Sequence, residues 1–514
     1  MNVGHHLTQA AARWPDKTAI IFEGKRYSYA EFNRLSNRAA NAFAAQGIRP
    51  GDRVAFITWN LPEQIACFYG LMKMGAVPVP INYRLAPNEL KFIIQNAGAR
   101  MVVFDDELVG QIAPIVPDLD VLGFVNIGTA RPGFAAEFYD FIGPAADTEP
   151  TLGAGWDDTA FIMYTSGTTG LPKGVLRSHR AETIGAMMIA QEVGFRHTDT
   201  CIHNKPLFHI AQLQLQVLPF IMIGGTAIIT RGFDVEETMN YVVSDRITVL
   251  HGVPTQLVMM MQQDLSKYDL SSLRTGFFGG QNLNDETTRA AMSIFKDRFL
   301  NLFGMTEALT CTGIDYFQRP DRIGSVGHTL PSVQMRIIKP DATDPNDVVA
   351  PGELGQVIMK TPAVMDGYLG LPEKTAAVLK DGWYFTGDGG NLDDEGGLYV
   401  HGRMDFTIKS GGENIHPSEV ENVLFRHPAI SDAAVIGMPD AKWGDMVTAA
   451  VVRTDPDLSA DALDRWCRES PDLADFKRPR KYFFVDEIPS NSTGKVERIK
   501  LKNHLMSLLE PQAT

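Results

Sequence analysis

The sequence predicts an α/β protein with a large N-terminal domain and a small α+β C-terminal domain. The chain has 514 residues, more than the roughly 250–300 residues at which a single core stops growing. Up to about residue 330, amphipathic helical stretches alternate with short apolar strands. After about Ser332 the segments become short and strand-like, with Gly and Pro turns between them. We therefore expect two similar α/β subdomains, a small β-rich subdomain and a compact C-terminal unit.

The alternation in the first part is typical of βα units on a largely parallel sheet. Apolar positions recur with helical spacing in four stretches, 31–46, 61–74, 87–96 and 235–243. Short apolar runs that read as strands lie between them, at 53–58, 77–81, 101–104, 225–230 and 248–251. The pattern occurs once before and once after Thr200, which predicts two similar halves.

The β-rich subdomain and the C-terminal domain follow in order. The predicted strands of the first lie at 335–338, 355–359 and 398–400. The C-terminal pattern contains a helix at 417–425 and strands at 433–436 and 448–452. We place the N-terminal domain at 1–402, the boundary at 403–406 and the C-terminal domain at 407–514.

Composition excludes several classes of protein. The net charge of −14 gives no overall electrostatic footprint for a nucleic-acid partner. The four cysteines are scattered, which argues against a disulfide scaffold or a Cys-rich zinc site and fits a reducing cytoplasm. We find no signal peptide, and the longest apolar run, 217–230, is too short to span a bilayer. We expect a cytoplasmic protein and leave a homodimer open.

The strongest local motif is a loop rich in glycine and hydroxyl groups, Tyr164-Thr-Ser-Gly-Thr-Thr-Gly-Leu-Pro-Lys-Gly-Val175, after an apolar strand. Its backbone N–H groups, its hydroxyls and Lys173 can surround a polyphosphate. It is not a Walker A loop, because only two residues separate Gly167 from Gly170 and Pro172 precedes the lysine. The later Thr493-Gly-Lys495 fails as well, since Val496 follows the lysine. A P-loop kinase or ATPase is therefore excluded.

This loop resembles the signature loop of the adenylate-forming superfamily, which includes acyl- and aryl-CoA synthetases, luciferases and the adenylation domains of peptide synthetases. Other family motifs follow in the family's order, from about residue 160 to 495. The resemblance implies ATP, Mg²⁺ and coenzyme A (CoA) as cofactors and a small mobile C-terminal domain. In the signature loop it implies a catalytic Thr165 and contacts to the nucleotide from Thr165, Ser166, Gly167, Thr168, Thr169, Gly170 and Lys173.

Asn301-Leu-Phe-Gly-Met-Thr-Glu307 resembles the second nucleotide motif. The resemblance implies that Phe303, where the family usually has Tyr, packs on adenine and that Glu307 helps to hold Mg²⁺. A carboxylate beside a phosphate loop is costly unless a hard cation bridges the two, which supports that role. The other nucleotide contacts implied around this motif are Gly304, Met305, Thr306, Gly280 and Gln281.

Tyr384-Phe-Thr-Gly-Asp388 and Gly402-Arg403 resemble the ribose motifs. A carboxylate suits the vicinal diol of ribose, because it offers several acceptor sites. Residue Asp405 matches the family's hinge. Ser410, Gly411 and Gly412 match a loop that lines the pantetheine tunnel, where glycines let a thin thiol arm pass close to the backbone.

Pro489-Ser-Asn-Ser-Thr-Gly-Lys495 resembles the motif that delivers the adenylation lysine. A carboxylate anion must approach an anionic phosphate, and Lys495 can neutralise charge on both. His209, in Pro206-Leu-Phe-His209, matches the junction between acyl pocket and thiol tunnel; the alternative is a hydrogen-bonded core histidine. For CoA, Trp443, Lys477 and Arg478 are candidate contacts, although a basic run such as 477–481 is equally consistent with a solvated face.

Four segments resemble the walls of the family's acyl pocket, 208–216, 251–255, 277–281 and 308–310. They contain no Arg or Lys to pair a second carboxylate, so a fatty or aromatic monoacid fits better than a dicarboxylate. If one of Gln212, Gln214 and Gln216 faces the pocket, the acid could carry a polar substituent. The expected pocket residues are His209, Pro254, Phe278, Gly279, Ala308 and Thr310.

The sequence therefore predicts an ATP-dependent acyl-CoA ligase. It forms an acyl-adenylate with release of pyrophosphate and passes the acyl group to CoA with release of AMP. Three alternatives remain: an enzyme that loads a carrier protein, a luciferase-like oxidation, and a non-catalytic nucleotide-binding protein of the same fold. The joint presence of Lys173, Glu307, Asp388, Arg403 and Lys495 argues against the last.

Overall fold

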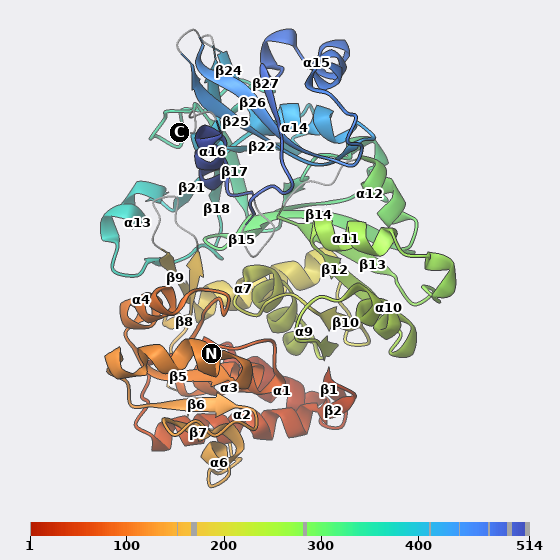
Figure 1. Cartoon of the computed structure of the whole chain (residues 1–514). Helices are drawn as coiled ribbons and strands as arrows, with labels where there is room; N and C mark the ends of the chain where they lie inside the picture. The colour runs from red at the N-terminus through yellow and green to blue at the C-terminus, as the bar shows by residue number, and fades with distance from the viewer. Residues whose placement is uncertain are drawn as a thin grey trace.

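In the computed structural model, three main β-sheets follow one another from the bottom to the top of Figure 1. The structure describes residues 2–151, 153–165, 172–280, 285–410, 413–440, 443–470, 473–490 and 496–508. A small sheet from the first part of the chain, red to orange, lies at the bottom of Figure 1, a large sheet runs through the middle, and the C-terminal sheet, blue, lies at the top.

The N-terminal sheet has five parallel strands in the order β4-β3-β5-β6-β7. Its strands are β3 (Arg53–Ile57), β4 (Val77–Pro80), β5 (Ala99–Asp105), β6 (Gly123–Ile127) and β7 (Ala135–Glu137). Parallel neighbours need crossover connections, and helices form several of them here. This arrangement agrees with the alternation of apolar strands and amphipathic helices in the sequence.

The second sheet has nine strands in the order β16-β15-β14-β13-β12-β10-β11-β1-β2. It is mostly parallel, but β2 at one edge and β15 and β16 at the other run antiparallel to their neighbours. Its strands are β1 (Thr18–Phe22), β2 (Lys25–Ser28), β10 (Thr200–His203), β11 (Thr226–Ile229), β12 (Val249–Gly252), β13 (Thr275–Gly279), β14 (Arg298–Met305), β15 (Leu309–Asp315) and β16 (His328–Thr329). The first two strands of the chain thus extend the sheet of the second half.

Helices cover these sheets and begin and end at the expected signals. Helix α2 starts with a capping box between Ser28 and Glu31, and α3 ends at Gly75, whose φ is 84°. Every residue of α3 is buried, because it lies between the sheet and α1, α2. The helices of this part are α1 (Gly4–Arg13), α2 (Tyr29–Ala45), α3 (Pro62–Met74), α4 (Pro87–Ala97), α5 (Val109–Ile112), α6 (Phe138–Ile142), α7 (His179–Val193), α8 (Ile210–Gln212), α9 (Leu218–Ile223), α10 (Val235–Ser244), α11 (Pro254–Met261) and α12 (Asp285–Met292).

A three-stranded antiparallel sheet, β19-β9-β8, stands between the larger sheets. It is formed by β8 (Thr159–Thr165), β9 (Lys173–Ser178) and β19 (Gly367–Tyr368). The predicted β-rich subdomain is an antiparallel sheet in the order β17-β18-β21-β20, with β22 paired to β21. Its elements are β17 (Gln334–Ile338), β18 (Gly355–Lys360), α13 (Pro372–Val378), β20 (Leu379–Lys380), β21 (Trp383–Leu392) and β22 (Leu398–Arg403).

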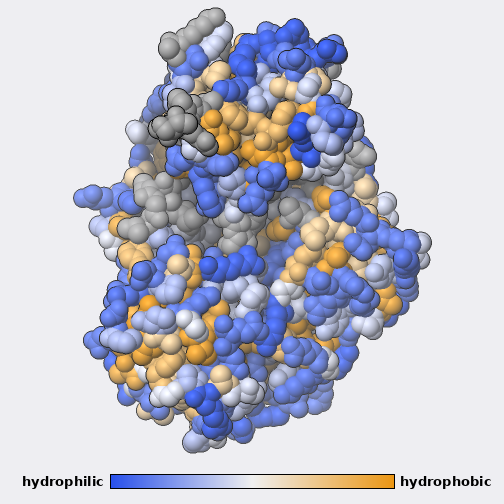
Figure 2. Space-filling model, in the orientation of Figure 1, coloured by the Kyte–Doolittle hydropathy of each residue, from blue (hydrophilic) through white to orange (hydrophobic). Residues whose placement is uncertain are grey.

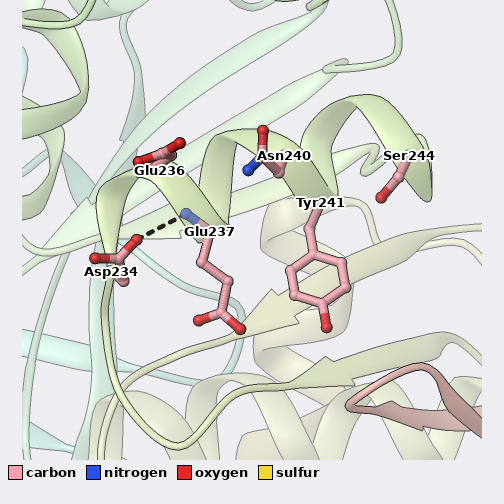
Figure 3. A pocket seen from close by; sticks show the side chains of 6 residues that line it. All are labelled: Asp234, Glu236, Glu237, Asn240, Tyr241 and Ser244. Atoms are coloured by element: carbon pink, nitrogen blue, oxygen red, sulfur yellow. Dashed lines mark hydrogen bonds between the residues drawn. The ribbon is translucent and has the colours of Figure 1, made fainter.

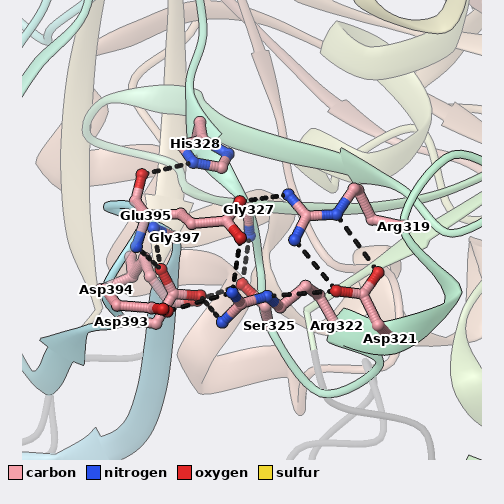
Figure 4. Close-up of polar contacts among 11 residues, drawn as sticks. Arg319, Asp321, Arg322, Ser325, Gly327, His328, Asp393, Asp394, Glu395 and Gly397 are labelled. Carbon is pink, nitrogen blue, oxygen red and sulfur yellow. Dashed lines mark hydrogen bonds and ion pairs between the residues drawn. The ribbon is translucent and has the colours of Figure 1, made fainter.

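A cluster of charged side chains ties the β21–β22 turn to the chain after β15 (Figure 4). Arg322 pairs with Asp393, Asp394 and Glu395 at 3.0, 3.0 and 2.7 Å, and Arg319 pairs with Glu395 at 2.7 Å. Asp394 and Glu395 are exposed, so their bridges add little stability each, whereas both side chains of the Arg322–Asp393 bridge are half-buried. Their shared geometry fixes the turn that orients β21 and β22.

The C-terminal sheet has the order β24-β23-β26-β25, with β27 parallel to β26. Its elements are β23 (Ile408–Ser410), β24 (Glu413–Ile415), α14 (Pro417–Phe425), β25 (Ile430–Asp440), β26 (Gly444–Arg453), α15 (Ala460–Glu469), β27 (Lys481–Phe484) and α16 (Arg498–Ser507). Hydrophilic residues cover most of the face in Figure 2, and hydrophobic residues gather in its upper part, over this sheet. Within the described ranges, none of the helices combines the length and apolar character needed to cross a membrane.

Candidate active site

The hairpin β8–β9 carries the glycine-rich loop at its turn. Thr165, the last residue of β8, lies opposite Lys173, the first residue of β9. The loop residues Ser166, Gly167, Thr168, Thr169 and Gly170 lie outside the described residues. The hairpin register still fixes both ends of the loop, so Thr165 and Lys173 flank it as the sequence predicts.

Glu307 lies in the tight connection between β14 and β15 and points toward the same hairpin. The hydroxyl of Tyr368 donates a hydrogen bond of 2.9 Å to its Oε1 atom. The ammonium of Lys173 lies 4.7 Å from the centre of the Tyr368 ring. Tyr368 thus contacts two residues that are about 130 positions apart in the chain, Glu307 through its hydroxyl and Lys173 through its ring.

The main chain of Glu307 is held independently of its carboxylate. Its carbonyl oxygen accepts hydrogen bonds from the backbone N–H of Met365 at 2.6 Å and from Nη1 of Arg177 at 3.3 Å. Arg177 is fully buried and pairs with Glu182 of α7, Nε to Oε1, at 2.7 Å. Strand β9, helix α7 and the β14–β15 connection are therefore joined below the site.

The two ribose-motif residues face each other across β21 and β22. Asp388 and Arg403 are paired in the register, and Oδ1 of Asp388 lies 3.6 Å from Nη1 of Arg403. Arg403 also donates to the carbonyl of Thr386. Gly387 has φ of 72°, and a Cβ atom there would lie 2.5 Å from Nη2 of Arg403. A glycine is thus required for both the backbone conformation and the space that the guanidinium occupies.

The second nucleotide motif runs from the end of β14 into the connection that holds Glu307. Phe303, Gly304, Met305 and Thr306 are all half-buried. Gly304 allows close packing, because a Cβ atom there would lie 2.2 Å from the carbonyl oxygen of Leu309. Gly280, just after β13, has φ of 86° and open space around it, and Gln281 lies outside the described residues.

A cluster of buried nitrogen-containing side chains surrounds the start of segment 205–216. Lys205 is 3% exposed, and its ammonium donates to the carbonyl of His251 at 2.6 Å. Burial lowers the pKa of Lys205 to about 7, and burial together with Lys205 lowers the pKa of His203 to about 3. Burial also lowers the pKa of His209 to about 4, and its Nδ1 accepts from the backbone N–H of Ala211. All three histidines of the cluster, His203, His209 and His251, are therefore neutral at pH 7.

The glutamines of this segment are engaged inside the protein. Gln212 contacts His203 at 2.7 Å, Gln214 donates to Glu182 at 2.6 Å, and Gln216 donates to Cys201 at 3.0 Å. Ala211, just before them, and Leu215 are half-buried, whereas Leu213 is buried. Ala211 and Leu215, and not the glutamines, thus form the more open face of this segment.

The remaining expected pocket residues do not share one environment. Ala308 and Thr310 are buried beside Glu307, and Pro254 is buried at the start of α11. Gly279 packs closely on β14, since a Cβ atom added to it would lie 2.4 Å from the carbonyl oxygen of Leu302. Phe278 points into the core under α10 and α11, where its ring stacks on Phe299 at 5.2 Å. Its neighbour Phe277, on the other face of β13, stacks on His251 at 4.3 Å.

The candidates in the C-terminal part are only partly described. Gly411, Gly412 and Lys495 lie outside the described residues, and of Asp405 only the backbone, in the short helix Met404–Phe406, is described. Ser410 is buried at the end of β23.

The candidates for CoA binding already have partners within the C-terminal part. Lys477 pairs with Glu419 at 3.0 Å, and Arg478 pairs with Asp464 and Asp475. Trp443 lies under the guanidinium of Arg480, 5.7 Å from it. Carboxylates thus partly neutralise the basic run 477–481. These ion pairs are consistent with a solvated face as well as with a CoA site.

Two family models cover most of the chain. The model described as AMP-binding enzyme matches residues 7–369, and the model described as AMP-binding enzyme C-terminal domain matches residues 419–495. The chain belongs to the family of AMP-binding enzymes. The predicted membership of the adenylate-forming superfamily, in its acyl-CoA synthetase branch, is therefore confirmed.

Relatives of this AMP-binding enzyme match it along nearly its whole length. A feruloyl-CoA synthase of Amycolatopsis sp is 35% identical over 505 residues, 96% of this chain and 97% of the relative. A fatty acid–[acyl-carrier-protein] ligase, ScoC, of Streptomyces coeruleorubidus is 32% identical (95% and 93%). The long-chain-fatty-acid–CoA ligase FadD13 of Mycobacterium tuberculosis is 33% identical (98% and 98%). ATP-bound MatB from Rhodopseudomonas palustris superposes with a TM-score of 0.90 at 30% identity, over 99% and 100% of the two chains, which confirms the predicted fold class.

Magnesium fits the residues that this AMP-binding enzyme brings together. Among the described residues, no three His, Cys, Asp or Glu side chains are grouped as ligands for a metal ion. Mg²⁺ bound with a nucleotide needs only one or two carboxylates besides the phosphates and water. Glu307, in the β14–β15 connection, offers hard carboxylate oxygens, and Tyr368 contacts both it and Lys173 at the end of the glycine-rich loop. Glu307 would hold the ion, and the ion would stabilise charge on the departing pyrophosphate.

A depression on the surface of this AMP-binding enzyme is a poor candidate for the nucleotide site. It has a volume of about 330 Å³ and lies along α10, lined by Asp234, Glu236, Glu237, Asn240, Tyr241 and Ser244 (Figure 3). Its three carboxylates would repel phosphates, and none of the motif residues lines it. A smaller depression of about 150 Å³ does reach Lys173, with Asn96 and Lys374 on its rim.

Three functional neighbours were not found by sequence reasoning. Tyr368 lies between the recognised motifs, Arg177 lies just beyond the loop, and Lys205 precedes the segment expected to form the pocket wall. Strand β9 has no two-residue pattern that could have indicated Arg177, because residues on both of its faces are buried. For Tyr368 and Lys205 the sequence carries no signal either.

Proposed function

We propose that this AMP-binding enzyme activates a carboxylic acid with ATP and transfers the acyl group to CoA. The observation that carries the proposal is the convergence at Tyr368, whose hydroxyl donates to Glu307 and whose ring faces Lys173 at the end of the glycine-rich loop. A carboxylate and a cation held near a loop of backbone donors are what an adenylation reaction needs around its polyphosphate.

Each step is assigned to groups of this chain. In adenylation, the loop with Thr165 and Lys173 binds the phosphates, Glu307 holds Mg²⁺, and Asp388 and Arg403 hold the ribose. Lys495 neutralises the acid and the α-phosphate as they approach, and pyrophosphate leaves. In thioester formation, the CoA thiol attacks the acyl carbon and displaces AMP, with the neutral His209 at the junction.

The C-terminal domain serves both steps in turn. We assign the domain boundary to 403–406 and the hinge to Asp405. Polar side chains of the two parts meet near it: Ser418 donates to the carbonyl of His401 at 2.6 Å, and the rings of His401 and His416 lie 5.9 Å apart. Such a small polar contact costs little to break, which supports a rotation there.

The acid is an apolar or aromatic monoacid. The three glutamines Gln212, Gln214 and Gln216 are occupied by buried partners, while Ala211 and Leu215 are half-buried. The cations near these residues are engaged as well, because the ammonium of Lys205 is turned to the carbonyl of His251 and Arg177 is paired with Glu182. The relatives that act on ferulate and on long-chain fatty acids agree with this class.

The acceptor is tested against the main alternative, a carrier protein. That alternative is supported by the ScoC relative, which is named for an acyl-carrier-protein acceptor. Incubation of enzyme, ATP, Mg²⁺ and acid with either CoA or a phosphopantetheinylated carrier protein, followed by mass spectrometry, separates the two. We expect acyl-CoA; acylated carrier without acyl-CoA would contradict the proposal.

A further inference from the structure

Tyr368 contacts groups from two nucleotide motifs but belongs to neither of them. It forms the short strand β19 with Gly367 and pairs with Val175 of β9, two residues after Lys173. Its side chain is 5% exposed. From this position its hydroxyl reaches Glu307 and its ring faces Lys173, and it packs in the same core cluster as Tyr384 of β21.

The direction of the hydrogen bond between Tyr368 and Glu307 follows from the chemistry of the groups. An ionised carboxylate can only accept, so the hydroxyl of Tyr368 donates its proton to Oε1 of Glu307. This bond restrains one oxygen of the carboxylate and leaves the other free of Tyr368.

The ring of Tyr368 restrains the opposite charge. Lys173 lies over its face, where the negative quadrupole of an aromatic ring attracts a cation. Within the described residues, no ion pair joins Lys173 to Glu307, although Tyr368 touches both. Without this side chain, the Lys173 ammonium and the Glu307 carboxylate could form a direct ion pair. Lys173 would then no longer be available to the phosphates of ATP, nor Glu307 to Mg²⁺.

We propose that Tyr368 is a positioning residue for adenylation, which directs the Glu307 carboxylate toward Mg²⁺ and the Lys173 ammonium toward the phosphates of ATP. The inference rests on the proposed function of Glu307 and deepens it. Tyr368 itself transfers no proton and forms no bond to substrate. Its effect is to keep two opposite charges separate until the metal–nucleotide complex enters between them.

The test measures ATP binding by calorimetry, once with Mg²⁺ and once with EDTA. Tyr368→Phe removes the donor to Glu307 and keeps the ring. It should reduce the gain in affinity that Mg²⁺ provides, roughly tenfold as expected for one hydrogen bond to a charged group. ATP affinity in EDTA should stay as in the wild type. Tyr368→Leu also removes the ring, so it should weaken ATP binding under both conditions.

The controls separate positioning from folding. Tyr29→Phe is matched, because Tyr29 is fully buried and its hydroxyl donates to the carbonyl of Gly225 at 2.6 Å, far from these motifs. It should leave the effect of Mg²⁺ unchanged. If Tyr368→Phe does not fold, Tyr368→Leu carries the test, since it lacks the same hydroxyl and should also reduce the gain in affinity that Mg²⁺ provides.

The outcomes distinguish this inference from the proposed function. Glu307→Gln should abolish most of the affinity gained with Mg²⁺. If Glu307→Gln does so while Tyr368→Phe behaves like the wild type, or weakens binding equally with Mg²⁺ and EDTA, the positioning role of Tyr368 is wrong and that of Glu307 stands. If Glu307→Gln has no effect, the metal-binding role of Glu307 fails, and the role of Tyr368 fails with it.

Discussion

Arg177 and Glu182 form an ion pair, Nε to Oε1 at 2.7 Å, in which both side chains are fully buried. Glu182 also accepts from Gln214, and Arg177 donates to the carbonyl of Glu307. One buried pair therefore connects the strand after the glycine-rich loop, the segment at the acyl side and the connection that holds Glu307. Disturbing it should affect stability and the site together.

Arg177→Met should destabilise the N-terminal domain strongly. Removing one member of a buried pair leaves the other charge without compensation, which costs about 3–5 kcal/mol of unfolding free energy. Urea unfolding at 25 °C measures this loss. The double variant Arg177→Met/Glu182→Leu should recover most of it, because an apolar pair of similar volume no longer buries a charge. A double variant as unstable as the single one would contradict this explanation.

Gly387→Ala should impair ATP binding. The new methyl group would meet the guanidinium of Arg403 and displace it from Asp388. We expect the KM for ATP to rise about tenfold, equivalent to about 1.4 kcal/mol. Gly396→Ala is the matched control, because Gly396 has φ of 86° in the β21–β22 turn but nothing within 4 Å of its Cβ position. Equal KM values in both variants would mean that backbone strain, and not Arg403, is responsible.

The buried histidines should make the protein sensitive to acid. The folded protein lowers the pKa of His203 from 6.5 to about 3, so between these values the unfolded chain binds a proton that the folded chain does not. Stability is therefore full above pH 6.5 and is lost as pH falls toward 3, by about 1.4 kcal/mol per pH unit for one proton. Urea unfolding from pH 4 to 7 gives the slope of the unfolding free energy against pH. In His203→Gln this slope should correspond to about one proton fewer than in the wild type. An unchanged slope would show that His203 does not titrate in this way.

Ala211→Phe should narrow the range of acids accepted. Ala211 lies on the more open face of its segment, and its replacement adds a ring where the body of the acid is proposed to lie. The kcat/KM for aromatic and long-chain acids should fall roughly tenfold or more, as expected for overpacking by about 1–3 kcal/mol. The KM for ATP should stay unchanged. Uniform loss across short and long acids would place Ala211 outside the acyl pocket.

Much of the fold could be predicted from the sequence, because period and turn chemistry are local. The helix at 417–425 coincides with α14, and the run 217–230, which read as a buried helix or strand, contains α9 and then β11. The pairing of β1 with β11, some 200 residues apart, carries no local signal. The same limit applies to the site: Glu307 was found from its motif, whereas Tyr368 and Lys205 matter only through contacts distant in the chain.

The central claim is that the chain adenylates an acid and transfers it to CoA. The most direct measurement is acid-dependent release of pyrophosphate across fatty, branched, aromatic and alicyclic acids, with and without CoA, with Lys495→Ala as control. We predict release with one class of apolar monoacid, faster turnover with CoA, and loss of release in the variant. Pyrophosphate release that does not depend on any acid, or that persists undiminished in Lys495→Ala, would contradict the account.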